Sequence, residues 1–426
     1  MDFSIPFDIT ARARGQAVLK RVAFWETLRP WFLSKGYTLY ALHCRHSGRS
    51  EKLPEPVCSF PIFGDIDGEA PDHPYAYFGM DEEETAALEA YAADKTSGCS
   101  PPYPPLFAPF QARIFFAQDA HKRHVAIRVV KDATEEYRIL RYLSKQDDLL
   151  SSEGFQCVLP VLDMLQYGKY WFVVMPRWGT SYGESGFPTV RACLRYMECC
   201  LTGMAFLHRH RIAHADIRIS NTLTNHFGSE QYRMASSNLR DALHRQDRIS
   251  HAIIDFDRAR MLPPGIDYLD AAYVRGWHPL NPPSAGELLY DPFVRDVGTL
   301  GGMFCFRFQG LIEDMPLMAP FLDRMVTIDI QQRFTAAKAL DFLHHVLRAS
   351  LAYDQLSCRP AVWLIGSCED DRWSDLPHEF VEQWATYCAP RHTATAVFLH
   401  GICKTQAGWQ LVRASRHIGR FIRIEL

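Results

Sequence analysis

The chain has 426 residues, a net charge of −3 at pH 7, 47% hydrophobic residues and 22% charged residues. At roughly 150 residues per domain, this length predicts about three domain-sized units, or one large two-lobed domain with extensions. The composition is that of a folded globular chain, and the near-neutral charge without a long basic stretch argues against nucleic acid as a partner.

Membrane and secretion signals are the next features to consider. No apolar run reaches the ~18–20 residues that span a bilayer, so we expect no transmembrane helix and no membrane partner. The start, Met1-Asp2-Phe3-Ser4, lacks the basic residues and apolar core of a secretory signal, so we expect an intracellular, cytoplasmic protein. The 12 cysteines are scattered without a CxxC pair, which predicts neither a zinc framework nor a disulfide scaffold.

The first predicted element is a helix over residues 24–32, because aromatic and aliphatic residues recur there every three or four positions. Gly36 follows as a stop signal before a strand-like segment at residues 37–43. Residues 47–109 are rich in Pro, Gly and Asp and are interrupted by an expected exposed helix at residues 81–95. We therefore expect residues 1–110 to form an N-terminal extension packed on the unit that follows.

A small β-rich unit with one helix is predicted next, over residues 111–178. Its strand candidates are residues 112–118, 124–130, 157–165 and 170–175, and its amphipathic helix contains Glu136, Ile139, Leu140 and Leu143.

The character of the sequence changes after residue 179. From Val190 to Leu207, apolar residues step by three or four, which predicts a long buried helix that ends at residues 208–211. A helix-rich unit then extends to residue 352. Residues 353–426 form a C-terminal extension of unknown role, and we expect its tryptophans to dock on the rest of the chain. These are Trp363, Trp373, Trp384 and Trp409.

The residues that carry chemistry follow the long helix. His214, Asp216 and Asn221 form an HxDxxxxN pattern in a loop, and Asp255 comes directly after the apolar pair Ile253-Ile254. Carboxylate and amide oxygens are the ligands that Mg²⁺ prefers. This pattern is typical of phosphoryl transfer, in which Asn221 and Asp255 would bind a metal-bound triphosphate while Asp216 orients a hydroxyl nucleophile.

These motifs, together with others in the same order along the chain, resemble those of the protein kinase superfamily. The matching segments are Val125-Ala126-Ile127-Arg128, Glu136 in the following helix, the hinge-like Met175 to Trp178, Asp296 before Gly301, and Arg333 with Glu287. The resemblance covers about residues 112–347. Within it, the sequence is similar to divergent kinase-like proteins of basidiomycete fungi. It implies an α+β, two-lobed protein kinase-like fold with a small lobe at residues 111–178 and a large lobe at residues 179–352.

The resemblance also implies roles for individual residues. The expected activity is ATP-dependent transfer of the γ-phosphate to Ser/Thr hydroxyls, with ATP and Mg²⁺ as cofactors and an unidentified protein substrate. The implied catalytic residues are Asp216, Asn221 and Arg218. The implied metal ligands are Asn221 and Asp255, and the implied nucleotide-binding residues are Arg128, Glu136, Met175 and Arg177.

Several departures from the kinase pattern keep two alternatives open. Residues 115–124 contain no glycine, Arg128 stands where kinases carry a lysine, and Asp257 replaces the glycine of the DFG motif. Lys131 is a possible substitute for the missing lysine, and the segment from Asn221 to Asp255 includes a polar insertion at residues 228–251. These features would weaken catalysis. One alternative is a pseudokinase that serves as a binding or scaffold module. The other is a small-molecule phosphotransferase of the aminoglycoside-kinase type, which needs no glycine-rich loop.

Overall fold

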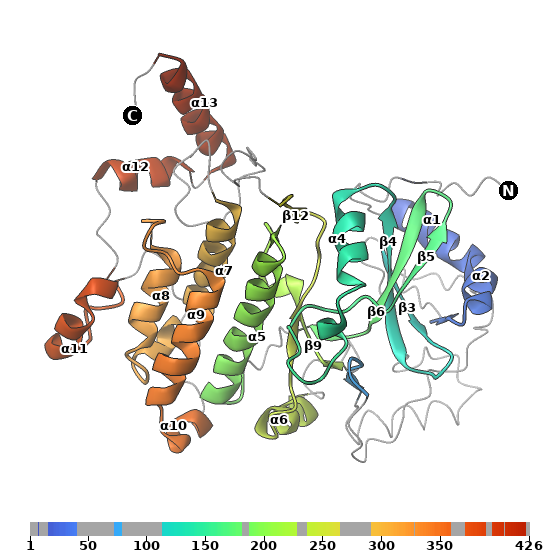
Figure 1. Cartoon of the computed structure of the whole chain (residues 1–426), viewed down its shortest axis with the longest axis horizontal. Helices are drawn as coiled ribbons and strands as arrows, with labels where there is room; N and C mark the ends of the chain where they lie inside the picture. Colours follow the sequence, from blue (N-terminus) through green and yellow to red (C-terminus); the bar gives the residue numbers. More distant parts are fainter. Residues whose placement is uncertain are drawn as a thin grey trace. The chain divides into compact units, whose positions relative to one another are not determined.

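The computed structural model describes residues 7, 16–40, 72–78, 113–180, 187–227, 237–264, 291–327, 329–358, 371–388, 394–403 and 405–422. The chain divides into two compact units, which are described separately below. Unit 1 comprises Met1–Gly186 and Thr222–Ile254, and unit 2 comprises Phe187–Asn221 and Asp255–Leu426. An antiparallel sheet in unit 1 is combined with many helices, in agreement with the α+β class expected from the sequence (Figure 1).

The main element of unit 1 is a five-stranded antiparallel sheet with strand order β1-β3-β4-β6-β5. Its strands are β1 (Thr38–Leu39), β3 (Ile114–Gln118), β4 (His124–Lys131), β5 (Asp163–Tyr167) and β6 (Tyr170–Pro176). Asp119 closes the turn between β3 and β4, because its carboxylate accepts hydrogen bonds from the main-chain N–H groups of His121 and Arg123, at 2.9 Å each. Helix α4 (Glu135–Leu143) follows β4, and Thr134 caps its N-terminus.

The N-terminal helices α1 (Gln16–Thr27) and α2 (Arg29–Ser34) belong to the same core as this sheet. Trp25 stacks on Phe115 of β3 with ring centroids 4.9 Å apart, and Phe32 contacts Phe172 of β6 edge-on at 4.8 Å. Gly36 then adopts φ +86°, a left-handed conformation that suits glycine, before the chain enters β1. These aromatic contacts are how the described part of the N-terminal extension packs on the small unit.

The strand expected at residues 157–165 is wrong in its first half. Only β5, from Asp163, is a strand, while Val158 makes a single isolated bridge to Ile253. Pro160 has no N–H to donate to a neighbouring strand, which explains why regular pairing does not extend through this segment. The helix expected at residues 81–95 lies outside the described residues.

Two smaller sheets complete unit 1. Strands β7 (Gly179–Thr180), β9 (Thr222–Thr224) and β11 (His251–Ile253) form one sheet, and β2 (Tyr77–Phe78) pairs in parallel with β10 (His226–Phe227) in the other. The expected polar insertion between β10 and β11 contains helix α6 (Ser237–Arg245). Arg240 of α6 donates hydrogen bonds to the main-chain oxygens of Thr180 and His226. This helix is therefore tied to the strands beside it.

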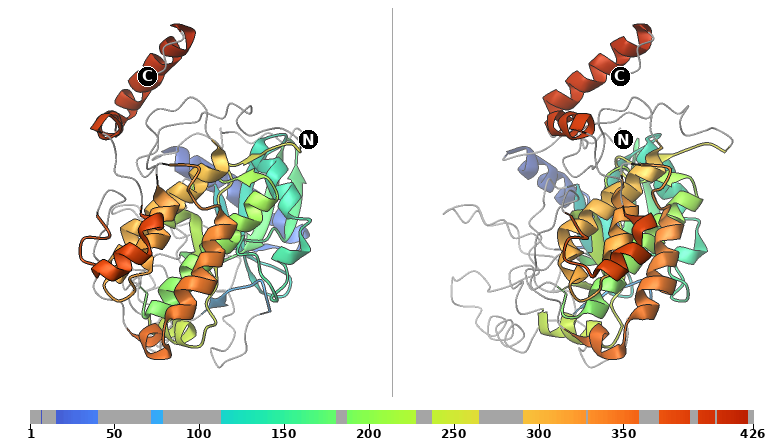
Figure 2. Two further views of the ribbon diagram at one scale, coloured as in Figure 1. Left: turned by 60° about the vertical axis from the view of Figure 1, so that its left-hand side comes forward. Right: turned by 90° about the vertical axis from the view of Figure 1, so that its left-hand side faces the viewer.

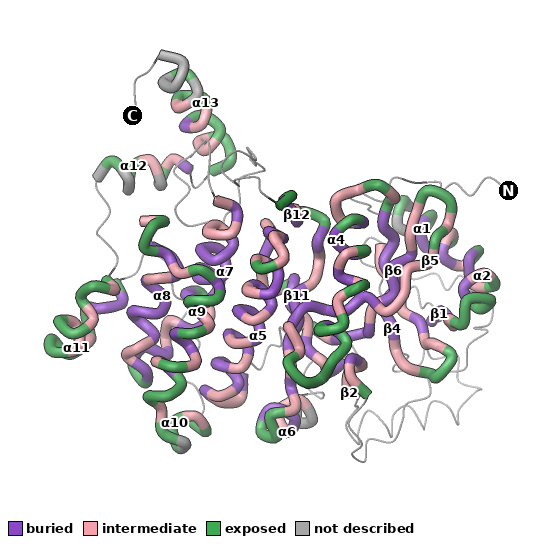
Figure 3. Tube along the Cα trace, viewed as in Figure 1, coloured by how far each residue is buried: buried purple, intermediate pink, exposed green. Residues whose placement is uncertain are grey.

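Unit 2 is built around helix α5 (Val190–Arg209), which is buried along most of its length as the apolar spacing predicts. It packs against α7 (Pro292–Phe308) and α9 (Ala336–Phe342), and α7 packs against α8 (Met318–Val326). These four helices lie side by side in Figures 1 and 2, and Figure 3 shows buried residues along their facing sides. A two-stranded ribbon joins β8 (Ile212–Ala213) to β12 (Arg260–Met261).

Small residues let α7 approach its neighbours closely. A Cβ atom added at Gly298 would lie 2.5 Å from Nη1 of Arg333, and one at Gly301 would lie 2.7 Å from Cβ of Met325 in α8. Both distances are shorter than van der Waals contact. A larger side chain at Gly301 would therefore push α7 away from α8, and one at Gly298 would displace the guanidinium of Arg333.

The described part of the C-terminal extension packs on these helices at residues 371–388. The buried carboxylate of Asp323 in α8 accepts hydrogen bonds from Nη1 of Arg372 and Nε1 of Trp373, at 2.7 Å each. Trp384 packs edge-on against Phe342 of α9 with ring centroids 5.9 Å apart. Trp373 and Trp384 are thus docked, whereas the ring of Trp409 lies beside Arg413 of its own helix and Trp363 lies outside the described residues.

C-terminal to α9, the described residues include the helices α10 (Tyr353–Ser357), α11 (His378–Gln383), α12 (Ala394–Cys403) and α13 (Gln406–Ile422). None of the helices in the described segments is both long and apolar enough to cross a bilayer.

Candidate functional site

The loop that carries the HxDxxxxN pattern lies in unit 2, between β8 and the 3-10 turn η2 (Ile219–Asn221). Three residues around it adopt a left-handed backbone conformation: Arg211 has φ 59°, Ala215 has φ 60° and Asp255 has φ 72°. Such conformations cost a non-glycine residue of order 1–3 kcal/mol and are concentrated at functional sites. The motif segments thus contain three of the seven non-glycine residues with positive φ in the described part of the chain.

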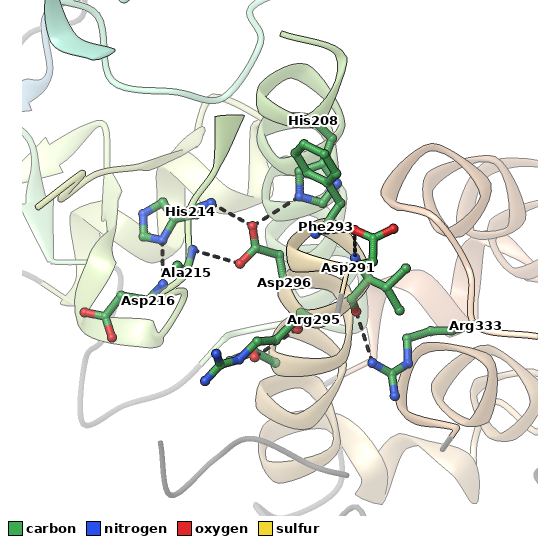
Figure 4. Close-up of polar contacts among 11 residues, drawn as sticks. His208, His214, Ala215, Asp216, Asp291, Phe293, Arg295, Asp296 and Arg333 are labelled. Atoms are coloured by element: carbon green, nitrogen blue, oxygen red, sulfur yellow. Dashed lines mark hydrogen bonds and ion pairs between the residues drawn. The ribbon is translucent and has the colours of Figure 1, made fainter. Parts of the chain in front are cut away.

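Asp296 of α7 fixes the start of this loop (Figure 4). Its carboxylate accepts a hydrogen bond from the main-chain N–H of His214 at 2.7 Å and another from that of Ala215 at 2.8 Å. Nε2 of His208, at the end of α5, lies 3.2 Å from the same carboxylate. Asp296 is buried, so these bonds are made away from water, where they position the backbone most strongly.

Asp216 lies next to this hydrogen-bonded segment and is itself buried. The side-chain amide of Asn221 donates to the main-chain oxygen of Asp216 at 2.8 Å and to its carboxylate at 3.3 Å. Arg218 makes an ion pair with Oδ2 of Asp216, and Nη1 of Arg258 lies 3.8 Å from Oδ1. The Asp216 side chain is 1% exposed, whereas those of Arg218 and Arg258 are 42% and 50% exposed. The outer surface of this site is therefore lined by guanidinium groups.

The segment that begins at Asp255 runs beside the same loop. Phe256 is buried with its ring edge-on to His214, at a centroid distance of 5.5 Å. Arg258 reaches Asp216, and β12 pairs with β8 directly before the loop. The structure thus brings the chain on both sides of Phe256 to the loop that contains Asp216 and Asn221.

Asn221 and Asp255, the expected metal ligands, both carry side-chain oxygens of the kind that Mg²⁺ prefers. Within the described ranges, no group of three or more His, Cys, Asp or Glu side chains is arranged to hold a metal. Mg²⁺ usually binds one or two protein oxygens together with substrate phosphates and water. Asn221 and Asp255 supply such a pair of oxygen-bearing side chains.

In unit 1, Arg128 and Glu136 are paired. Nη2 of Arg128 on β4 lies 2.6 Å from Oε1 of Glu136 on α4, and both side chains are largely buried. This contact fixes α4 relative to the sheet. Lys131, at the end of β4, is exposed. Met175 packs near Leu159 and Trp178 in a small apolar cluster.

Arg177, which the resemblance assigns to nucleotide binding, lies in unit 1 directly after β6. Its guanidinium is buried among three aromatic rings, with Cζ 4.1 Å from the ring centre of Phe116, 4.3 Å from Phe227 and 5.1 Å from Tyr40. Enclosure of this kind is a cation–π arrangement within unit 1. Burial, together with the nearby charge of Arg177, lowers the pKa of His124 to about 3.

Arg333 lies in the segment before α9 and is buried. Its guanidinium donates hydrogen bonds to the main-chain oxygens of Thr327, at 2.5 and 3.0 Å, and of Val294 in α7, at 3.1 Å. Arg333 therefore links the segment before α9 to α7 (Figure 4). Glu287, its expected partner, lies outside the described residues.

Sequence reasoning did not find three residues at this site: Arg258, His208 and Phe256. Only Phe256 carried a sequence signal, since it follows Asp255 as the aromatic residue of the DFG-like motif. Arg258 and His208 reach the site through tertiary packing, which no local pattern reveals.

Neither protein-family models nor curated proteins provide a relative for this chain. A scan against protein-family models finds no family that matches the chain, and a search of curated proteins finds no match. A functional proposal for the chain therefore rests on its motifs and its side-chain geometry.

Proposed function

We propose that this chain has a protein kinase-like fold and transfers the γ-phosphate of ATP to Ser/Thr hydroxyls. The observation that carries the proposal is the hydrogen bonding of Asp296 to the main chain of His214 and Ala215, beside a buried Asp216 bound by Asn221. Catalysis of phosphoryl transfer depends mainly on positioning, and this network positions one carboxylate within a strained loop.

Each residue then has a defined task. Mg-ATP, when bound, supplies the phosphoryl group and neutralises part of its charge. Asp216 orients the acceptor hydroxyl and takes its proton, and Arg218 offers a cation beside the carboxylate. Asn221 and Asp255 hold the metal. The pair of Arg128 and Glu136 orders α4 and β4 in unit 1, where kinases use a Lys–Glu pair.

The sheet of unit 1 also supports the proposal. Kinases carry the paired lysine on the third strand of their small lobe, and Arg128 lies on β4, the third strand counted from the β1 edge of this sheet. The glycine-free segment at residues 115–124 is β3 and the turn that follows it. In the kinase arrangement the glycine-rich loop joins the first two strands. The corresponding connection here, residues 40–113, lies mostly outside the described residues.

The alternative of a pseudokinase is favoured by one observation. Both carboxylate oxygens of Asp216 face guanidinium groups, from Arg218 and Arg258, so an acceptor hydroxyl would have to compete for them. None of the contacts given above for the described residues favours the aminoglycoside-kinase alternative in the same way.

A thermal shift followed by a phosphorylation assay tests the proposal. Mg-ATP should raise the melting temperature of the wild type and of Asp216→Asn, since a ligand at free concentration L that binds only the folded state stabilises it by RT ln(1 + L/Kd). Autophosphorylation should occur in the wild type and be lost in Asp216→Asn. Asp314→Asn, an exposed carboxylate in the turn before α8, is the matched control and should retain activity. Stabilisation by Mg-ATP with no turnover in the wild type would select the pseudokinase, and no stabilisation would reject ATP-dependent phosphoryl transfer.

A further inference from the structure

The helix pair α12–α13 carries an exposed apolar face that the proposed function does not use. The two helices pack on one another, and a Cβ atom at Gly408 would lie 2.0 Å from the main-chain oxygen of Ile402, so glycine is needed where they meet. Val412 and Cys403 are buried. Phe398, Leu411 and Ile418 are instead 67%, 64% and 60% exposed, among the highest values for large apolar side chains in the described segments.

The charge on this segment has a single sign. From residue 389 to residue 424 the sequence contains six basic residues and no Asp or Glu. At about 100° per residue, α13 places Leu411, Ala414 and Ile418 on one face and Arg413 and Arg416 on the opposite side. The helix is therefore amphipathic, with arginines as the charged residues of its polar face. Figure 3 shows how much of α13 is exposed.

A basic amphipathic helix is suited either to a membrane surface or to the groove of an acidic protein. A groove encloses most of the helix that it binds, but α13 already packs against α12. A bilayer surface needs only one open face, into which apolar side chains sink while arginines meet phosphate groups. The one-sided exposure and the absence of acidic residues thus favour a lipid partner.

We propose that α12 and α13 bind the surface of a bilayer containing acidic phospholipids, with Leu411 and Ile418 entering the acyl boundary. This inference is independent of the catalytic proposal, because no residue of the candidate site takes part. A helix that lies on a membrane need not span it, so the absence of a spanning helix in the described segments does not bear on the proposal.

Cosedimentation of the full chain with vesicles tests this. We expect binding to vesicles of phosphatidylcholine with added phosphatidylserine, little binding to phosphatidylcholine alone, and release at high salt as charges are screened. The double variant Leu411→Asp, Ile418→Asp should abolish binding. Each substitution in Arg413→Gln, Arg416→Gln should weaken it about five-fold, since a basic residue near an anionic surface contributes about that factor.

Leu33→Asp is the matched control, because Leu33 in α2 is similarly exposed, at 62%, but lies outside this helix pair. It should bind as the wild type does. All the substituted side chains are at least partly exposed, so circular dichroism should show unchanged folding. Equal binding to both kinds of vesicle, or binding that survives the aspartate substitutions, would overturn the proposal. Failure to bind vesicles together with capture by calcium-loaded calmodulin, used as an acidic groove, would replace the lipid with a protein partner.

Discussion

Removal of the Asp296 carboxylate should destabilise unit 2 more than any other single change in α7 that leaves the helix intact. In Asp296→Ala, the N–H groups of His214 and Ala215 lose an acceptor that lies 2.7 and 2.8 Å away. A buried donor deprived of its partner costs about 1–3 kcal/mol, and bonds to a charged acceptor are at the upper end. Two such losses predict a decrease of about 3–5 kcal/mol in the free energy of unfolding.

Asp291 provides a control on the same helix. It caps α7 by accepting hydrogen bonds from the N–H groups of Phe293 and Val294, but it is less buried than Asp296. Loss of a helix cap costs about 1 kcal/mol, so Asp291→Ala should have a small effect. For a unit of this size, each kcal/mol shifts the melting temperature by about 2–4 °C, so the two variants should differ by about 4–16 °C.

Calorimetry and hydrogen exchange measure the two consequences. The melting temperature should fall far more in Asp296→Ala than in Asp291→Ala, and peptides covering residues 210–221 should exchange faster only in Asp296→Ala. Equal shifts in the two variants, or unchanged exchange in the loop, would show that Asp296 does not position the loop.

Three other substitutions give distinct expectations. Glu136→Gln removes the charge that faces Arg128 in a buried pair and should cost about 3–5 kcal/mol in urea unfolding, whereas joint replacement of Arg128 and Glu136 by apolar residues should cost much less. Asp323→Asn weakens two buried hydrogen bonds to the C-terminal extension; we expect a lower melting temperature and faster proteolysis after residue 371. Burial, with a nearby arginine, lowers the pKa of His226 from 6.5 to about 3. Below pH 6.5 the unfolded chain therefore binds one proton that the folded chain does not, and the free energy of unfolding falls as the pH drops. In His226→Gln, the loss of stability per pH unit should be smaller by an amount that corresponds to at most one proton. Replacement of an exposed histidine should leave this pH dependence unchanged.

Local sequence patterns were sufficient to predict the helices and strands whose apolar residues form a clear pattern. The three- and four-residue steps from Val190 to Leu207 correspond to α5, which ends two residues later at Arg209. The strand expected at residues 170–175 is β6 with one further residue. In both elements the apolar residues that make the sequence pattern are those that are buried in the structure, so the pattern was enough to predict the element.

The candidate site was only partly predictable, because its partners come from distant parts of the sequence. The pairing of Arg128 with Glu136 and the proximity of Asn221 to Asp216 were expected from motif order. The enclosure of Arg177 by aromatic rings was not expected, because its neighbours Tyr40 and Phe227 lie far from it in sequence. Such contacts depend on which segments pack together, and a local pattern carries no information about that.

The interleaved course of the chain affects how the protein can be made. Unit 1 is complete only after Ile254 has been synthesised, yet α5 of unit 2 is translated before it. The apolar face of α5 must then wait for α7, which begins at Pro292. At about 5–20 residues per second, roughly 80 residues separate the end of α5 from the start of its partner, a delay of about 4–16 s on the ribosome. During this interval a twenty-residue apolar helix lacks α7 and α9, two helices that it packs against in unit 2, so we expect α5 to need chaperone protection.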